Sequence, residues 1–329
     1  MQAMSHKERL RAALAGEPVD RAPVALWGHD FAREFSAQGL AEATIEAYRA
    51  YDWDLVKVNP RFTYYWEAWG IPYEFNGTTH PRRVDTTQRS VADLAAMPVI
   101  GPGAPPFAEQ LHALGRVVAA VGDEVDVIQT VFNPLTVASG YLAMSPAEFR
   151  AAVAADPASA HVGLGRIAES LAAYSARSID DGASGIFLAT VEWGTRDAAD
   201  EAFYREFGRP YDLRVLAEVR GAPVNVLHVC RDHNLLDLLL DYPVAAFNWD
   251  AHGAGNASLS EVASRADVAV MGGIDRRLLK SGSAAEVSAQ VAKDLGAVTT
   301  KRFILAGGCS IDPAAPVRNL QAALRAAGR

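Results

Sequence analysis

Short apolar runs recur along the 329-residue chain, and longer amphipathic segments separate most of them. The runs occupy residues 22–28, 54–60, 125–132, 184–190, 222–229, 243–249, 267–273 and 302–308. Consecutive apolar positions are typical of parallel strands that are covered on both faces. Segments such as 145–182 and 283–297 instead repeat their apolar residues at helical spacing. The pattern therefore predicts eight strands that alternate with helices.

This alternation favours one fold class. Eight strand–helix units are the number found in a (β/α)8 TIM barrel, which is an α/β fold. A doubly wound open sheet is the alternative, but no glycine-rich turn follows the first predicted strand. Residues 61–110 contain no clear helical pattern, so we expect an insertion after strand 2, formed by a hairpin that overhangs the barrel mouth. No linker-like segment divides the chain, and we expect residues 1–329 to form a single domain.

Composition and charge narrow the class of protein. Half of the residues are hydrophobic and 21% are charged, which is typical of a globular protein with a full core. The net charge of −8 argues against general nucleic-acid binding. No apolar run reaches the roughly 20 residues that span a membrane, and the first residues lack an apolar signal core. Two cysteines do not form a disulfide framework. We expect a cytoplasmic protein with reduced thiols, and leave its oligomeric state open.

Polar or metal-binding residues stand at the end of every predicted strand. They are His29 with Asp30, Asn59, Asn133, Glu192, His228 with Cys230, Trp249 with Asp250, Asp275, and Cys309. In a barrel these strand ends converge on one mouth, where active sites lie. We interpret His29, Asp30, Asn59, Asn133, Trp249, Asp250 and Asp275 as candidate substrate-binding residues.

Three of the acidic residues have open alternatives. Glu192 is the candidate catalytic residue, as a fourth metal ligand, a proton donor or a substrate contact, but a solvated loop acid would look the same. Asp250 and Asp275 would orient His228 or bind a substrate cation. Their alternative role is to cap the helices that follow the strands, which aspartate does well.

His228, Cys230 and Cys309 form the strongest candidate site. His228 and Cys230 are two positions apart, so on a strand both side chains lie on the same face. Together with Cys309 they offer one imidazole and two thiolates. Catalytic zinc commonly has three protein ligands and one open position, and thiolates favour zinc over magnesium or calcium. We expect the two sulfurs to lie about 4 Å apart even without an ion. The alternative is that both cysteines are small core residues.

Several stretches of the chain resemble the uroporphyrinogen decarboxylase superfamily in order and spacing. The resemblance is carried by residues 227–250 (LHVCRDHNLLDLLLDYPVAAFNWD), 270–279 (VMGGIDRRLL) and 303–319 (FILAGGCSIDPAAPVRN). Residues 20–27, 132–142 and 200–216 also agree with it. The resemblance covers nearly the whole chain and implies a (β/α)8 barrel.

The superfamily contains two chemistries, and the residues favour one of them. The decarboxylases carry an arginine-rich motif after the first strand and a histidine in the last strand. This chain offers only Arg33 at the first place and Cys309 at the second. The other branch comprises zinc-dependent methyltransferases that work with corrinoid proteins. Their metal motif is His-x-Cys followed by a distant cysteine, which His228, Cys230 and Cys309 match.

The resemblance therefore implies a zinc-dependent methyltransferase. It would move a methyl group between a corrinoid (methylcobalamin), supplied by a partner protein, and a thiol or a methoxy or methylamino small molecule. Two alternatives stay open. One is a decarboxylase of a tetrapyrrole or a small carboxylate, and the other is a non-catalytic barrel that binds a corrinoid or tetrapyrrole.

Overall fold

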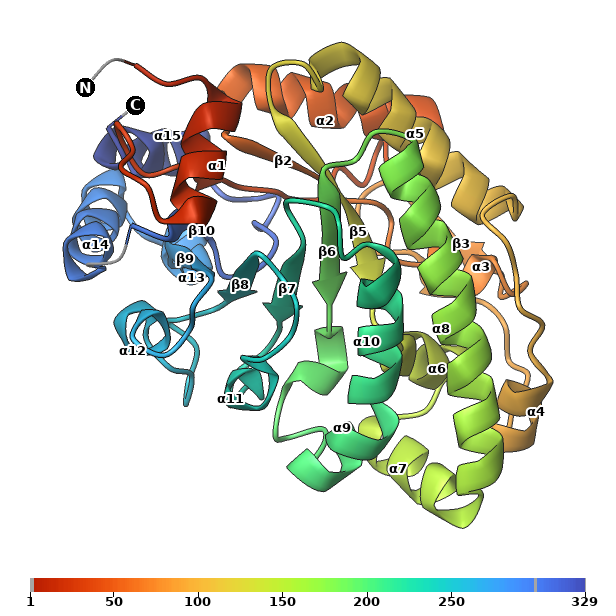
Figure 1. The fold of residues 1–329 in the computed structure, drawn as a ribbon. Coiled ribbons are helices and arrows are strands. Elements are labelled where there is room, and N and C mark those ends of the chain that lie inside the picture. Colours follow the sequence, from red (N-terminus) through yellow and green to blue (C-terminus); the bar gives the residue numbers. More distant parts are fainter. Residues whose placement is uncertain (1–2, 299–300, 329) are drawn as a thin grey trace.

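Eight parallel strands form a barrel with helices on its outside (Figure 1). The computed structural model describes residues 3–298 and 301–328. The strands are β1 (Val24–Ala25), β2 (Leu55–Val58), β5 (Asp126–Phe132), β6 (Gly185–Ala189), β7 (Val226–Val229), β8 (Ala246–Trp249), β9 (Ala269–Ile274) and β10 (Phe303–Gly307). Their order in the sheet is β1-β10-β9-β8-β7-β6-β5-β2. All eight predicted strands are confirmed, each shorter than its apolar run.

The barrel closes between β1 and β2 through one residue. The backbone N–H of Asp54 donates to the carbonyl of Val24 over 2.8 Å. The Asp54 carboxylate in turn accepts from the backbone N–H of Val24, also over 2.8 Å. Arg9 and Arg21 each donate to the same carboxylate over 2.7 Å. The predicted α/β TIM barrel is therefore confirmed, with a polar seam where the first two strands meet.

The helices are distributed around the barrel as the amphipathic segments predict. They are α1 (His6–Ala15), α2 (Ala37–Tyr51), α5 (Pro105–Val121), α6 (Pro134–Leu142), α7 (Pro146–Ala155), α8 (Pro157–Asp180), α9 (Glu201–Phe207), α10 (Arg209–Glu218), α11 (Leu236–Leu239), α12 (Leu259–Ala263), α13 (Arg276–Ser281), α14 (Ala284–Ala297) and α15 (Val317–Ala326). A 3-10 helix, η1 (Val191–Gly194), follows β6. In the described part of the chain, no helix has the length and apolar character needed to cross a membrane.

The insertion after β2 contains the expected hairpin, made of the antiparallel strands β3 (Tyr73–Glu74) and β4 (Arg82–Arg83). His80, between these strands, packs edge-on against His29 with ring centroids 5.0 Å apart, so the hairpin reaches the barrel mouth. The expectation that residues 61–110 lack helices is wrong. They contain α3 (Tyr64–Glu67), α4 (Val91–Ala96) and the first turn of α5. Both α3 and α4 are too short to show a helical period, and burial of their aromatic and aliphatic residues holds them.

Alternation along β7 decides which residues enter the barrel. Val226 belongs to the cluster of buried side chains inside the barrel, whereas Leu227 and Val229 pack in the layer between strands and helices. Side chains two positions apart share a face, so His228 lies on the inner face with Val226. The strand register thus turns His228 towards the barrel interior and Cys230 towards its mouth.

Candidate metal centre and adjoining cavity

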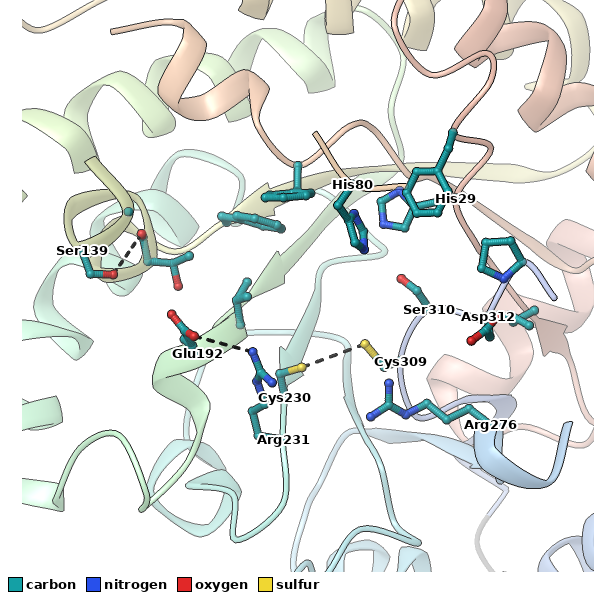
Figure 2. Close-up of a pocket in the computed structure, with 18 of the residues that line it drawn as sticks. His29, His80, Ser139, Glu192, Cys230, Arg231, Arg276, Cys309, Ser310 and Asp312 are labelled. Atoms are coloured by element: carbon teal, nitrogen blue, oxygen red, sulfur yellow. Dashed lines mark hydrogen bonds and ion pairs between the residues drawn. The ribbon is translucent and has the colours of Figure 1, made fainter. Parts of the chain in front are cut away.

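His228, Cys230 and Cys309 meet at the barrel mouth, although two of them are far apart in sequence. The Cys230 and Cys309 sulfurs lie 4.0 Å apart, as expected (Figure 2). One ligand atom from each of the three residues lies within 4.8 Å of the others. Both cysteines are free thiols. Tetrahedral ligands about 2.0–2.3 Å from one zinc ion must be near neighbours of this kind, so the three residues fit a zinc ion.

A buried hydrogen-bond chain fixes the ring of His228. Its Nδ1 lies 2.6 Å from Oδ1 of Asn248, which is fully buried on β8. The Asn248 amide nitrogen donates to the carbonyls of Met271 (3.0 Å) and Gly307 (3.1 Å). Because these two carbonyls can only accept, they orient the amide so that its oxygen faces His228. Nδ1 of His228 must then carry the proton, which leaves the lone pair of Nε2 free for a metal.

The two thiols are electrostatically unlike. The hydrogen bond between the sulfurs, together with burial, raises the pKa of Cys230 well above its usual value. The same bond, and the neighbouring His228, lower the pKa of Cys309 well below its usual value. Either sulfur can be the donor of this hydrogen bond, and the direction of the two pKa shifts favours the thiolate at Cys309. Since the thiolate is the form that binds metal, Cys309 is prepared as the first sulfur ligand.

Lys57 adds a buried amine close to this pair. Its Nζ donates to Oδ1 of Asn59 over 2.6 Å and lies 4.7 Å from the centre of the Phe187 ring. Burial lowers the pKa of Lys57 to about 7, and the charge of Cys309 opposes that shift. The sequence signal was a lysine within an otherwise apolar strand, and our sequence analysis missed it.

A cavity of about 670 Å³ opens beside the two sulfurs. Four cationic side chains line it: Arg231, Arg276, Arg277 and Lys280. Phe31, Phe62, Trp66 and Phe132 also line it, and we call these four residues the aromatic wall. In Figure 2, His29 and His80 lie on the side of the cavity opposite Arg276. The volume lies within the range of about 300–1,000 Å³ that is usual for small-molecule sites.

Four of the predicted site residues line this cavity: His29, Glu192, Cys230 and Cys309. Nδ1 of His29 lies 2.8 Å from a carboxylate oxygen of Glu34, whose side chain is fully buried. That contact leaves the other ring nitrogen of His29 for the cavity. Glu192 is half exposed, and its carboxylate lies 3.8 Å from the Arg231 guanidinium. His228 lies just beneath the cavity, on the inner face of β7.

Six of the predicted substrate-binding residues lie elsewhere. Asp30 and Asn59 line a second hollow together with Arg33. Asn133 caps α6, accepting from the backbone N–H of Thr136. Trp249 is fully buried, and its indole N–H donates to the carbonyl of Ala257 over 2.8 Å.

Asp275 and Asp250 both interact with the start of α13, the helix that follows β9. Asp275 caps α13 by accepting from the backbone N–H groups of Arg277 and Leu278, which is the structural role weighed for it. Asp250 is buried, and one of its oxygens lies 3.6 Å from both Arg276 and Arg277. Asp250 therefore holds two cavity arginines and does not line the cavity itself.

Asn248, Glu34 and Arg276 were missed by the sequence analysis. Asn248 and Glu34 act through the histidines that they orient. Asn248 lies on the strand next to that of His228, and Glu34 lies five residues after His29 in the segment between β1 and α2. Arg276 stands in the turn GGIDRR, where sequence gives its position but not the direction of its side chain. Only the packed barrel brings these residues together.

The fold and the site define an α/β-barrel protein with an imidazole–dithiol cluster at the barrel mouth. The chain belongs to the uroporphyrinogen decarboxylase (URO-D) family, whose model matches residues 5–329. Among curated proteins it is 25% identical, over 269 residues, to the uroporphyrinogen decarboxylase of Synechococcus sp. (strain CC9605). That match covers 78% of this chain and 73% of the relative. The uroporphyrinogen decarboxylase of Rhodococcus erythropolis is 27% identical over 57% of this chain and 52% of that protein.

Solved structures with the same fold include a methyltransferase from Methanosarcina mazei. It superposes with a TM-score of 0.81 at 21% identity, covering 99% of this chain and 98% of that one. A putative vitamin-B12-independent methionine synthase from Listeria monocytogenes superposes with a TM-score of 0.56 at 14% identity. That match covers 93% of this chain and 94% of the other. At such identities these likenesses concern the fold.

Proposed function

We propose that the protein is a zinc-dependent methyltransferase that moves a methyl group between a corrinoid and a small molecule. The small molecule would be a thiol or a methoxy or methylamino compound. The observation that carries the proposal is the cluster of His228, Cys230 and Cys309, with 4.0 Å between the sulfurs. A decarboxylase site would not require two thiols and an oriented imidazole beside the substrate cavity.

The residues of this chain would hold the metal and prepare its ligands. His228 would offer Nε2, since Asn248 fixes the proton on Nδ1. Cys309 would bind as the thiolate that its surroundings favour, and Cys230 would lose its proton on binding. Zinc bound here would supply Lewis acidity, which lowers the pKa of a thiol or polarises a heteroatom. Three protein ligands leave one position for the substrate.

The corrinoid would come from a partner protein. The fold that this chain shares with a methyltransferase from Methanosarcina mazei, over nearly its whole length, agrees with a methyltransferase. The cavity of about 670 Å³ beside the sulfurs would take the small molecule. His29 lines that cavity with one ring nitrogen held by Glu34, and would contact the substrate through the other.

The test combines metal analysis with a transfer assay on the purified full-length protein. We expect about one zinc per chain, and transfer of a methyl group from methylcobalamin to 2-mercaptoethanol. Cys309→Ser and the Cys230→Ser/Cys309→Ser double variant should lose both. His112→Gln, a change at an exposed histidine of α5, is the control and should keep both. Normal zinc content in the double variant would refute the proposal.

A decarboxylase is the second candidate, because both curated relatives are uroporphyrinogen decarboxylases. One feature of the structure opposes it. Arg33, the only arginine at the place of the family's carboxylate-binding motif, is engaged by Asp30 (2.8 Å) and Glu46 (2.6 Å). Metal-independent loss of carboxyl groups from uroporphyrinogen, retained in Cys309→Ser, would establish this function instead. Tight binding of cobalamin without any methyl transfer would indicate a binding protein.

A further inference from the structure

Arg276 is one of the four cationic side chains that line the cavity. Figure 2 shows its side chain extending towards Cys230 and Cys309. The Arg276 guanidinium therefore stands beside the place that the three metal-binding candidates define.

Two of the four cavity cations, Arg231 and Arg276, make no side-chain hydrogen bond within the described residues. Lys280 is paired with Asp312 over 2.6 Å, and Arg277 donates to the carbonyl of His252 over 2.6 Å. Arg231 faces Glu192. The Nε of Arg276 is buried 3.6 Å from Asp250 without a hydrogen bond, and the two outer guanidinium nitrogens have no hydrogen-bond partner in the described part of the chain.

A guanidinium without a hydrogen-bond partner is suited to bind an anionic group of the ligand. A guanidinium binds a carboxylate through two parallel hydrogen bonds, which are stronger than bonds between neutral groups. Arg277 and Lys280 are hydrogen-bonded and Arg231 faces Glu192, so Arg276 is the guanidinium beside the sulfurs that is left for a ligand. One such group matches the charge of a single carboxylate better than that of a phosphate dianion.

The aromatic wall indicates what the rest of the ligand is made of. Phe62 packs edge-on against Trp66, with ring centroids 5.8 Å apart, and His80 packs against Phe62 at 4.9 Å. Aromatic faces and edges bind another ring by burial and by offset or edge-on contacts. A small polar acid would leave this wall and much of the cavity of about 670 Å³ without contacts.

Resting on the proposed methyl transfer at this site, we infer that the small-molecule substrate is an aromatic carboxylic acid. Its carboxylate binds Arg276, and its ring lies against the aromatic wall formed by Phe31, Phe62, Trp66 and Phe132. The cavity then selects for charge at one side and for a flat apolar body at the other.

Calorimetric titration of the purified full-length chain tests this inference with three compounds. They are 4-methoxybenzoate, its neutral analogue 4-methoxybenzamide, and methoxyacetate, which has the charge but no ring. We expect 4-methoxybenzoate to bind at least about tenfold more tightly than either of the others, the scale of one charge-assisted contact or one buried ring.

Variants assign the preference to Arg276. Arg276→Gln should remove the preference for the acid over the amide, and Arg276→Lys, which keeps the charge without the planar fork, should keep part of it. Arg265→Gln is the matched control, because Arg265 is paired with Asp237 outside the cavity. Thermal unfolding of each variant confirms that it is folded. Phe62→Ala should weaken both ring compounds and leave methoxyacetate unchanged.

Equal binding of the acid and the amide, no binding of any of the three, or an unchanged preference in Arg276→Gln would overturn the inference. These titrations contain no methylcobalamin and are repeated on metal-free protein. Ligand selectivity in a protein that lacks zinc and methyl transfer would contradict the proposed function alone. Zinc binding and methyl transfer without this selectivity would contradict the substrate class alone.

Discussion

Removal of the Asn248 side chain should weaken metal binding without touching a metal ligand. Asn248→Ala deletes the acceptor that holds Nδ1 of His228 at 2.6 Å. The imidazole can then rotate or place its proton on Nε2, which is the nitrogen that the metal needs. Loss of such an outer partner typically lowers metal affinity about 10- to 100-fold, or about 1.4–2.7 kcal/mol.

The same substitution also costs stability, and this must be separated from the effect on the metal. It leaves the carbonyls of Met271 and Gly307 without their donor, at about 1–3 kcal/mol for each buried group that stays unpaired. Asn319 offers a matched control. It is equally buried, and its amide nitrogen donates to the carbonyls of Leu279 (2.9 Å) and Gly282 (2.8 Å), away from the cluster.

Competition with a chromophoric zinc chelator, at neutral pH, measures the affinity of both variants. Urea unfolding of the metal-free proteins measures their stability. We expect Asn248→Ala and Asn319→Ala to lose similar free energies of unfolding, and only Asn248→Ala to lose zinc affinity. Equal zinc affinity in Asn248→Ala and the wild type would refute the role that we assign to this hydrogen-bond chain.

Three further outcomes follow from the structure. Gly140→Ala should destabilise the protein by about 1–3 kcal/mol in thermal unfolding, because a Cβ at this position would overlap the Trp66 ring; an unchanged melting temperature would contradict this. Burial raises the pKa of Asp212 from 3.8 to about 7, so the folded state keeps a proton that the unfolded chain has lost. The contribution of Asp212 to the unfolding free energy should therefore fall as pH rises from about 4 to 7. Urea unfolding at several pH values should show that Asp212→Asn lacks this decrease. If the unfolding free energies of the variant and the wild type changed with pH in the same way, the assignment would be wrong. His29→Asn and Glu34→Gln should each raise KM about threefold to tenfold, the scale of one lost hydrogen bond, with zinc content unchanged; lower stability with unchanged kinetics would assign them to packing.

The barrel could be predicted from the sequence because its strands are apolar on both faces, and burial imposes that pattern along the chain. The hairpin was predictable for a different reason, since residues 61–110 lack a helical period. The short helices α3 and α4 were not predicted, because helices of four to six residues are too short to show a helical period. Tertiary packing around Tyr64 and Leu94 stabilises them.

The candidate metal cluster could also be predicted from the sequence, because strand geometry determines it. The i, i+2 spacing of His228 and Cys230 fixes their common face, and parallel strands end at one edge. The roles of residues whose side-chain orientation depends on packing could not be predicted from the sequence. Trp249 and Asn133 follow or end strands as His29 does, yet Trp249 turns into the core and Asn133 caps a helix. Strand position alone does not distinguish a side chain that faces the mouth from one that supports it.

X-ray absorption spectroscopy at the zinc edge, on the protein as purified, tests the central claim most directly. With His228, Cys230 and Cys309 as ligands, we expect two sulfur neighbours at about 2.3 Å and one imidazole nitrogen at about 2.0–2.1 Å. Cys309→Ser should remove one of the sulfur neighbours. A protein without zinc, or with zinc surrounded only by nitrogen and oxygen, would contradict the claim that this cluster is a metal centre.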